Sequence, residues 1–315
     1  MKIRKAKDTD KNEVVNFCKN TFEWGDYIDK VWDIWLQDTS GLLLVAETYD
    51  NVKQNPYPIA LAHISECPNN ILWIEGVRVN KKYRHMGIAS SLITYISDIG
   101  LKNGFKEFNA IVSKTNTPSQ RMLEKNGFNK RFEVKYYNME VEKWNRSSDF
   151  SIQKENEIKI KIASCSDIQS IIEFIGKFII SKQSDVWYFN CWKFYKLDNT
   201  YDNLISLIRK SKILLFVDEV DNIKGISIIN FIDELESNLY KKTIVQICYL
   251  DCSCKTDISK VIDVLIDTYS NRSAIKNIQF YITNYINISH NKYIKRTSYF
   301  EEFYLYSKRL KNQNT

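Results

Sequence analysis

The chain is poor in the residues that interrupt regular structure. Its 315 residues include only 9 glycines and 4 prolines, so we expect few long or irregular loops. It also lacks an apolar run of the ~20 residues that a membrane-spanning helix needs. The N-terminus, Met-Lys-Ile-Arg-Lys-Ala-Lys-Asp, has no apolar signal-peptide core. We therefore expect a cytoplasmic protein with no membrane partner.

Cysteine and charge exclude further classes. The 7 cysteines are scattered without a disulfide framework, so we expect reduced thiols. Cys252 and Cys254 form one close pair, but no His or Cys partners lie nearby, so no metal site is predicted. The formal net charge of +7 is modest and forms no basic stripe. We therefore expect no nucleic-acid partner.

The length favours two domains, because a single hydrophobic core seldom serves a chain of this size. A polar stretch at 144–157 reads as a linker. It divides the chain into a first domain at 1–143, a second at 158–310 and a short tail at 311–315.

One stretch, Val77–Leu92, stands out in the first domain. A strand-like run ends in a basic turn that contains Gly87, and the turn leads into a helix with apolar residues at every third or fourth position. The N–H groups of such a turn and of the first helical turn point the same way, and the helix dipole adds positive charge. Gly87 leaves room for a phosphate to approach the backbone. The pattern predicts a cradle for a pyrophosphate.

The place of this cradle in the chain narrows the choice of ligand. The cradle follows the fourth predicted strand, whereas a Rossmann dinucleotide site follows the first. The sequence also has no Gly-Lys-Ser or Gly-Lys-Thr, which a P-loop requires. The expected order is a strand, two helices, three antiparallel strands, the cradle with its helix, a strand, a helix and terminal strands. The expected strands are 2–5, 42–47, 59–66, 71–79, 108–112 and 131–141.

This order and its motifs resemble the GCN5-related N-acetyltransferase (GNAT) family. The family signature Arg/Gln-x-x-Gly-x-Gly/Ala matches Arg84–Ala89, directly after Val77-x-Val79. A later pattern of Asn, a small residue and Gly-Phe matches Asn116, Ser119 and Gly127-Phe128. The resemblance covers residues 1–143.

The resemblance implies an α/β (α+β) fold with a mixed central sheet flanked by helices, and acetyl-CoA as the cofactor. It implies that the cofactor enters where the strands at 71–79 and 108–112 splay apart. The implied cofactor-binding residues are Val77, Val79, Arg84, His85, Met86, Gly87, Ile88, Ala89, Ser90, Asn116 and Ser119.

Glu75 is the candidate general base. It lies two residues before Val77, so the two side chains share one face of the strand, and some family members place their base here. The alternative is a salt bridge with Arg78 or Arg4. The backbone N–H of Val79 is the expected donor to the oxyanion.

The sequence departs from the family at one position. Many members carry a tyrosine that protonates the leaving thiolate, and the matching residue here is Leu123. Tyr136 and Tyr137 are the candidates to replace it. Alternatively, the thiolate leaves unprotonated.

The turn between the first two helices is the candidate substrate site. Glu23, Asp26 and Tyr27 lie there beside other aromatic residues, and we expect them to contact a cationic substrate. Gly25-Asp26-Tyr27 and Glu75–Val79 are also similar to segments of a histidine N-acetyltransferase group. This short match favours a free amino acid or similar small amine.

The second half repeats the order of elements but not the cradle. Its corresponding segment is Leu250–Asp257, which carries two acidic residues and no glycine. We therefore predict tandem GNAT domains with a degenerate second copy. An aromatic cluster between Trp187 and Tyr195 is expected to pack in the core or between domains, or else to wall the acceptor pocket.

The predicted function is an N-acetyltransferase that moves acetyl from acetyl-CoA to a primary amine by direct attack in a ternary complex. A small amine or amino acid is the expected acceptor, and a peptide amine, as in a protein N-alpha or lysine acetyltransferase, is the first alternative. The second alternative is a CoA-binding regulator without turnover. A monomer or a homodimer is expected.

Overall fold

The computed structural model describes residues 1–23, 25–49, 55–142, 158–179, 186–197, 200–210, 212–237, 240–283, 286, 288, 291, 294 and 299–310. These residues form two compact units. Unit 1 comprises Met1–Arg131 with Tyr304–Thr315, and unit 2 comprises Phe132–Phe303. In the described part of the chain, no helix is long and apolar enough to cross a membrane. The expected linker and tail lie outside the described residues.

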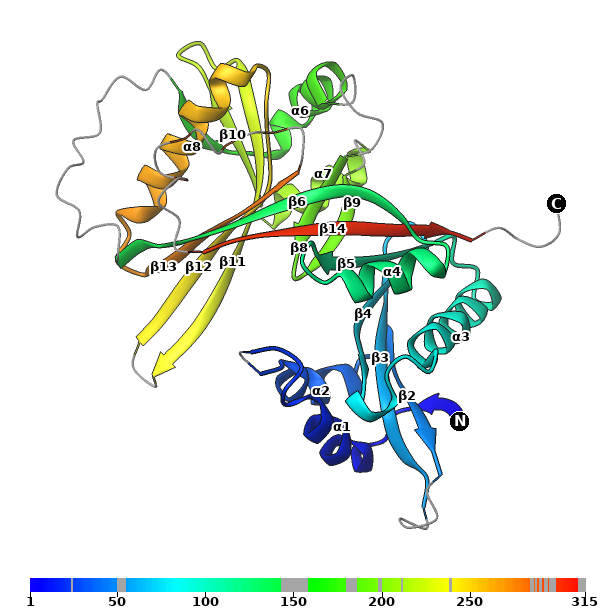
Figure 1. The fold of residues 1–315 in the computed structure, drawn as a ribbon. Coiled ribbons are helices and arrows are strands. Elements are labelled where there is room, and N and C mark those ends of the chain that lie inside the picture. Colours follow the sequence, from blue (N-terminus) through cyan, green and yellow to red (C-terminus); the bar gives the residue numbers. More distant parts are fainter. Residues whose placement is uncertain are drawn as a thin grey trace. The chain divides into compact units, whose positions relative to one another are not determined.

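Unit 1 is built on a mixed sheet whose strands follow the order β1-β2-β3-β4-β5-β14 (Figure 1). The pairs from β1 to β4 are antiparallel, and β5 runs parallel to β4. The strands are β1 (Lys2–Lys5), β2 (Gly41–Thr48), β3 (Tyr57–Cys67), β4 (Ile71–Val79), β5 (Glu107–Ser113) and the last part of β14 (Tyr299–Arg309).

Two helices cover each face of this sheet. They are α1 (Lys11–Cys18), α2 (Ile28–Leu36), α3 (Ile88–Lys102) and α4 (Thr117–Lys125). Because side chains alternate along a strand, Leu43 and Val45 of β2 pack with α1 and α2. Leu44 and Ala46 pack with α3 and α4. The sheet therefore has a buried core on both faces.

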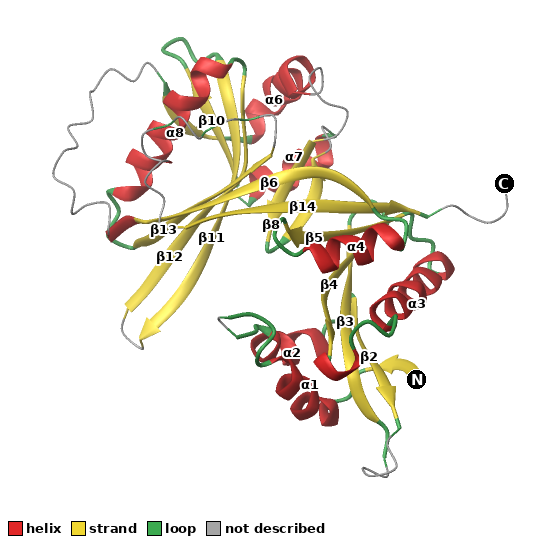
Figure 2. Ribbon diagram, viewed as in Figure 1, coloured by secondary structure: helices red, strands yellow, loops and turns green. Residues whose placement is uncertain are grey.

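Unit 2 repeats this plan, with strands in the order β6-β13-β12-β11-β10-β7 (Figures 1 and 2). Here β13 is parallel to β12, as β5 is to β4. The strands are β6 (Asn129–Glu140), β7 (Lys159–Ile162), β10 (Ile213–Val217), β11 (Ile223–Ser237), β12 (Tyr240–Cys252) and β13 (Ile275–Thr283). The helices are α6 (Ile168–Phe174), α7 (Tyr201–Arg209) and α8 (Lys255–Ser270).

The aromatic cluster expected between Trp187 and Tyr195 forms a hairpin of β8 (Val186–Asn190) and β9 (Lys193–Leu197). Phe189 and Phe194 are buried. The Phe189 ring also stacks on Tyr281 of β13, with 3.5 Å between ring centroids. The hairpin therefore contributes core side chains to unit 2.

The boundaries between the units differ from those expected near residues 143 and 158. They fall inside β6 and β14, so the last segment of the chain belongs to unit 1. There the Leu310 N–H donates to the Lys106 carbonyl at 2.9 Å, and Tyr306 Oη donates to Glu124 at 2.8 Å. The strand that pairs with the open edge of β5 is β14, from the distant end of the chain. Sequence patterns within contiguous segments could not predict this pairing.

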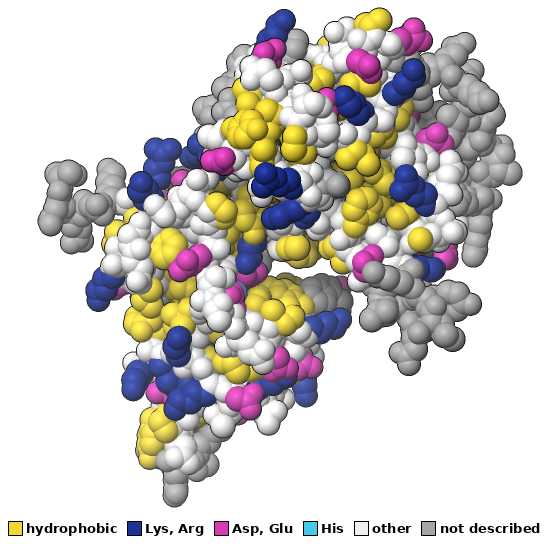
Figure 3. Space-filling model, turned by 180° about the vertical axis from the view of Figure 1, so that it is seen from behind, with side chains coloured by type: hydrophobic (Ala, Val, Ile, Leu, Met, Phe, Trp, Pro, Cys, Tyr) yellow, Lys and Arg dark blue, Asp and Glu magenta, His cyan; other side chains and the backbone are white. Residues whose placement is uncertain are grey.

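The surface carries charges of both signs. On the face drawn in Figure 3, Lys and Arg side chains are interspersed with Asp and Glu side chains and apolar ones. This distribution agrees with the modest net charge of +7.

Candidate active site

The strands β4 and β5 pair over only part of their length. Their register joins Ile71 to Glu107, Leu72 to Phe108 and Trp73 to Asn109, and it ends there. The remainder of β4, from Ile74 to Val79, has no register partner on β5 within these fully described strands. The two strands therefore part where the sequence places the cofactor.

A bulge distorts β4 at the same point. His63 of β3 lies opposite Glu75, while Leu61 lies opposite Arg78, so β4 contains an additional residue. Gly76 within the bulge has a φ of +65°. A Cβ atom on Gly76 would lie 2.6 Å from the Trp35 ring. Glycine is required here both by the backbone conformation and by the aromatic ring.

The predicted cradle lies between the end of β4 and α3. His85 and Gly87 adopt left-handed φ angles of +66° and +78°. Within the described residues, no backbone N–H from His85 to Ser90 donates to a backbone carbonyl. The first bond of α3 comes next, from Ser91 N–H to the Gly87 carbonyl at 2.9 Å. This run of open donors at a helix N-terminus is the arrangement that binds a phosphate.

The cradle is open to solvent. Arg84, His85 and Met86 are exposed, and a Cβ atom on Gly87 would meet nothing within 4 Å. Arg84 Nε donates to the Val79 carbonyl at 3.2 Å. That bond holds the guanidinium beside the end of β4, where it adds positive charge.

Asn116 and Ser119 begin α4. The Asn116 side-chain oxygen accepts from the Ser119 N–H at 3.2 Å and so caps the helix. At the other end of α4, Asn126 Nδ2 donates to Ser90 Oγ at 3.0 Å. This bond ties α4 to the first turn of α3.

Glu75 lies beside the bulge, and its side chain is 17% exposed. Its Oε1 lies 3.0 Å from Nδ1 of His63. The two arginines named as alternative partners are engaged elsewhere: Arg78 pairs with Asp26, and Arg4 pairs with Asp10 and Glu47. Glu75 therefore has an imidazole as its cross-strand neighbour.

The predicted substrate residues differ in their surroundings. Asp26 is 3% exposed at its side chain and binds Arg78, with 2.8 Å between Oδ2 and Nε. The Arg78 guanidinium also lies over the rings of Phe22 and Tyr27, 5.0 and 5.2 Å from their centroids. The charge of Asp26 is therefore balanced by Arg78, and its contact with a cationic substrate stays a prediction.

Tyr27 and Glu23 remain candidates for substrate contact. Burial, helped by the Glu75 carboxylate, raises the pKa of Tyr27, so its hydroxyl stays protonated at neutral pH. Its ring meets Trp35 edge-on at 6.0 Å. Glu23 lies in the exposed turn that Phe22 and Gly25 close.

Tyr136 and Tyr137 pack within unit 2, not unit 1. Both are buried, and Tyr136 lies among Tyr281, Trp192 and Tyr299. Burial raises the pKa of Tyr136 to about 12. These rings contribute to the packing of unit 2, and their role as proton donors to the thiolate stays a prediction. Leu123 lies in the core of unit 1.

The structure also adds three residues that the sequence did not indicate. The ring of His63 stacks on Trp35, with centroids 4.5 Å apart and planes 4° from parallel. Nδ1 of this ring is the nitrogen near Glu75, and its other nitrogen, Nε2, lies 3.4 Å from Oδ2 of Asp38. Burial runs unbroken along β3 from Pro58 to Ser65, so it does not single out His63. The bulge decides which residue of β4 lies opposite His63.

Known proteins resemble this chain in sequence and in fold. Residues 12–128 match the model of the Acetyltransferase (GNAT) family. No curated protein matches the chain.

Two solved structures resemble nearly the whole chain. A GCN5-related N-acetyltransferase from Sphaerobacter thermophilus has a TM-score of 0.63 at 11% identity, over 99% of this chain and 96% of its own. A tandem GNAT protein from the clavulanic acid biosynthesis pathway has a TM-score of 0.54 at 7% identity, over 99% of both chains. At these identities the likeness concerns the fold.

The tandem GNAT fold predicted from the sequence is thereby confirmed, since the likeness extends across both units. The segment that matches the family model lies within unit 1 and contains β4, the cradle and α4. Unit 1 is an acetyltransferase domain of the GNAT family.

Proposed function

We propose that this chain transfers the acetyl group of acetyl-CoA to the primary amine of a small molecule. One observation carries the proposal: Glu75 lies on β4 between the point where β5 departs and the open cradle at its end. A carboxylate in that position can accept a proton from an amine that approaches along the splayed strands.

The residues present fit acetyl-CoA. The open N–H groups from His85 to Ser90 suit a pyrophosphate, and the open space at Gly87 admits it. The unpaired edge of β4 at Val77 and Val79 suits an amide-bearing arm. When bound, the cofactor supplies an activated acetyl thioester.

The chemistry requires three roles from the protein. Glu75 takes the proton that the amine nitrogen loses on attack, and the Val79 N–H donates to the developing oxyanion. Tyr27, with Phe22 beside it, supplies an aromatic wall near Glu75 for the acceptor. With Leu123 at the family's tyrosine position, the thiolate leaves without a proton from α4.

A small acceptor is favoured because the charged groups near Glu75 are already paired. Asp26 and Arg78 neutralise each other, and the Arg78 guanidinium lies over two aromatic rings, which favours a compact, partly apolar amine. A protein α-amine or lysine is the alternative acceptor. The same enzyme acting on proteins would prefer peptides over free amines of the same chemistry.

A thiol-release assay tests the proposal. The full chain is mixed with acetyl-CoA and a panel of free amino acids, polyamines and short peptides, and free thiol is measured. We expect release with at least one free amine. Glu75→Gln should lower kcat about 100-fold with an unchanged KM for acetyl-CoA.

Glu66→Gln is the matched control, since Glu66 is an exposed glutamate on the neighbouring strand β3 and should retain full activity. Binding of CoA without thiol release across the panel would instead favour the non-catalytic regulator. That alternative is suggested by Leu123, which stands where many family members have the proton-donating tyrosine.

A further inference from the structure

His63 is an unusual residue to bury. Its side chain is 1% exposed and lies between two carboxylates, Glu75 at Nδ1 and Asp38 at Nε2. A buried imidazole is costly unless both nitrogens have partners. Its flat stacking on Trp35 fixes the ring plane, with Nδ1 in hydrogen-bonding contact with Glu75. Within the described residues, Nε2 lies 3.4 Å from the Asp38 carboxylate but makes no hydrogen bond.

Asp38 is held in place by its own turn. Its Oδ1 accepts from the N–H and the hydroxyl of Ser40, both at 2.9 Å. This leaves Oδ2 to face His63. A Cβ atom on Gly41 would collide with Oδ2, so the absence of a side chain there lets the carboxylate reach the ring.

Asp38 also reaches water. Its side chain is 22% exposed, and it lines a surface hollow of about 230 Å³ together with Trp35, Gly41 and Lys5. Contact with water reduces the cost of keeping the carboxylate charged. The hollow lies on the Asp38 side of His63, while Glu75 lies on the other.

Other titratable groups also lie in the surroundings of His63. Arg78 is paired with Asp26, Lys5 lines the hollow beside Asp38, and Tyr27 meets Trp35 from the side. Two carboxylates from different elements therefore lie within 3.4 Å of the imidazole nitrogens.

We propose that Glu75, His63 and Asp38 act as one acid–base unit, in which His63 stores the proton that Glu75 takes from the acceptor amine. This inference rests on the proposed function. Glu75 is the residue that touches the substrate, and His63 and Asp38 act through it.

The proton balance is simple. As the nitrogen–carbon bond forms and the carbon–sulfur bond breaks, the amine proton passes to a Glu75 oxygen and then to His63 Nδ1. The ring becomes a cation whose Nε2–H faces the Asp38 carboxylate. After the product leaves, the proton returns through Glu75 to water that enters the site, and the thiolate takes its own proton from solvent.

The test compares His63→Asn and Asp38→Asn with the wild type. In His63→Asn the introduced amide N–H can still donate to Glu75, yet the amide cannot accept a proton, so kcat should fall about tenfold or more. Asp38→Asn removes the balancing charge. Its kcat should fall about tenfold, and the pH profile of its kcat/KM should differ from that of the wild type, because the negative charge that faces the stored proton is gone. The KM for acetyl-CoA should not change in either variant.

Asp33→Asn is the matched control, since Asp33 lies on α2 and pairs with Lys11 on the surface. Wild-type kcat in His63→Asn, or an Asp38→Asn variant that matches Asp33→Asn in kcat and pH profile, would overturn the acid–base unit alone. If His63→Asn does not fold, the Asp38→Asn variant tests the proposal by itself, since Asp38 is partly exposed. A wild type that releases no thiol with the amine panel would overturn the proposed function as well.

Discussion

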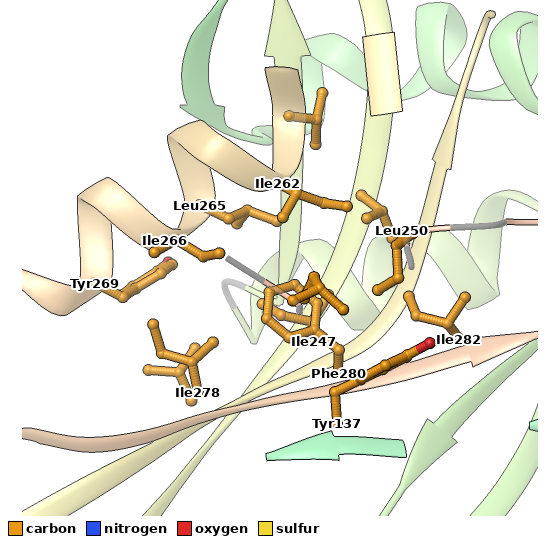
Figure 4. Close-up of a cluster of buried hydrophobic side chains, with 14 of the residues drawn as sticks. Tyr137, Ile247, Leu250, Ile262, Leu265, Ile266, Tyr269, Ile278, Phe280 and Ile282 are labelled. Carbon is orange, nitrogen blue, oxygen red and sulfur yellow. The ribbon is translucent and has the colours of Figure 1, made fainter. Parts of the chain in front are cut away.

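The two units share a register shift between equivalent strands, β3 and β4 in unit 1 and β11 and β12 in unit 2, but different side chains lie beside it. In unit 1 the pair beside the bulge is His63 and Glu75. In unit 2 the register also shifts, and the pair beside the shift is Ile229 and Ile247, both buried. Figure 4 shows Ile247 among the apolar side chains of β13 and α8. The fold therefore keeps its bulge with apolar residues beside it, and the His63–Glu75 pair is one feature that distinguishes the units.

The connection from the central strand to the next helix differs as well. In unit 1, residues 80–87 separate β4 from α3, and they form the cradle. In unit 2, only Ser253 and Cys254 separate β12 from α8. Two residues are too few to form such a turn. The Asp257 carboxylate also accepts from the side chains of both residues, at 3.0 and 2.9 Å, and places a negative charge where a phosphate would bind.

The largest expected effect comes from giving unit 1 the pair that unit 2 has. The double variant His63→Ile with Glu75→Ile should lose about 1,000-fold in kcat, since it removes the proposed base and its neighbour. Replacing a buried polar pair with apolar residues is often neutral for stability, so the melting temperature should be preserved. CoA binding, measured by calorimetry, should also be kept. A variant that still releases thiol at the wild-type rate would place the base elsewhere.

The next effect concerns the cradle. Gly87→Glu should weaken CoA binding about 100-fold, because it places a carboxylate and a strained left-handed residue at the helix start. Gly104→Glu is the matched control. Gly104 follows α3, has the same φ of +78° and also has open space at its Cβ position. Equal affinity for CoA in the two variants, by calorimetry, would contradict the cradle.

The difference between the two units also predicts how many CoA molecules bind to one chain. Calorimetric titration of the wild type with CoA should give one site per chain, supplied by unit 1. Asp257→Asn should leave that number unchanged, since the short connection still offers no cradle in unit 2. Two sites per chain would show that unit 2 is not degenerate.

How far the sequence predicts this molecule depends on how local each feature is. The cradle was predictable because the residues from Arg84 to Ser90 are contiguous and their motif is local. The partner of Glu75 was not, since the β4 bulge sets the register that brings His63 opposite. Asp38 lies in a turn with no motif, and only the fold brings it to the ring. The return of residues 304–310 to unit 1 is equally non-local.

The smallest expected effect concerns an ion pair that each unit forms between its first strand and the turn that follows it. In unit 1, Arg4 Nη1 donates to Asp10 Oδ2 at 2.7 Å, and the Lys7 N–H donates to the same carboxylate. In unit 2, Lys161 pairs with Asp167 at 2.5 Å, and the Ser164 N–H donates to Asp167. The spacing of six residues is the same, but the environment is not. The Asp10 side chain is 6% exposed and that of Arg4 18%, whereas Lys161 is 46% exposed.

Burial alone would raise the pKa of Asp10, but Arg4 and the Lys7 N–H outweigh it and hold that pKa below its ordinary value. The stabilisation is therefore present above about pH 4, the ordinary range of an aspartate, and is lost as the pH falls through the depressed pKa. At pH 7, Asp10→Asn should lower the opening free energy of unit 1 by about 2–3 kcal/mol, because the partly buried Arg4 guanidinium loses one of its two carboxylate partners. Asp167→Asn should cost unit 2 about 1 kcal/mol or less, since solvent screens its exposed lysine. Hydrogen exchange in peptides that cover β2, the partner of β1, and β10, the partner of β7, measures the opening free energy of each unit separately. Equal losses in the two units would show that burial does not set the strength of this pair.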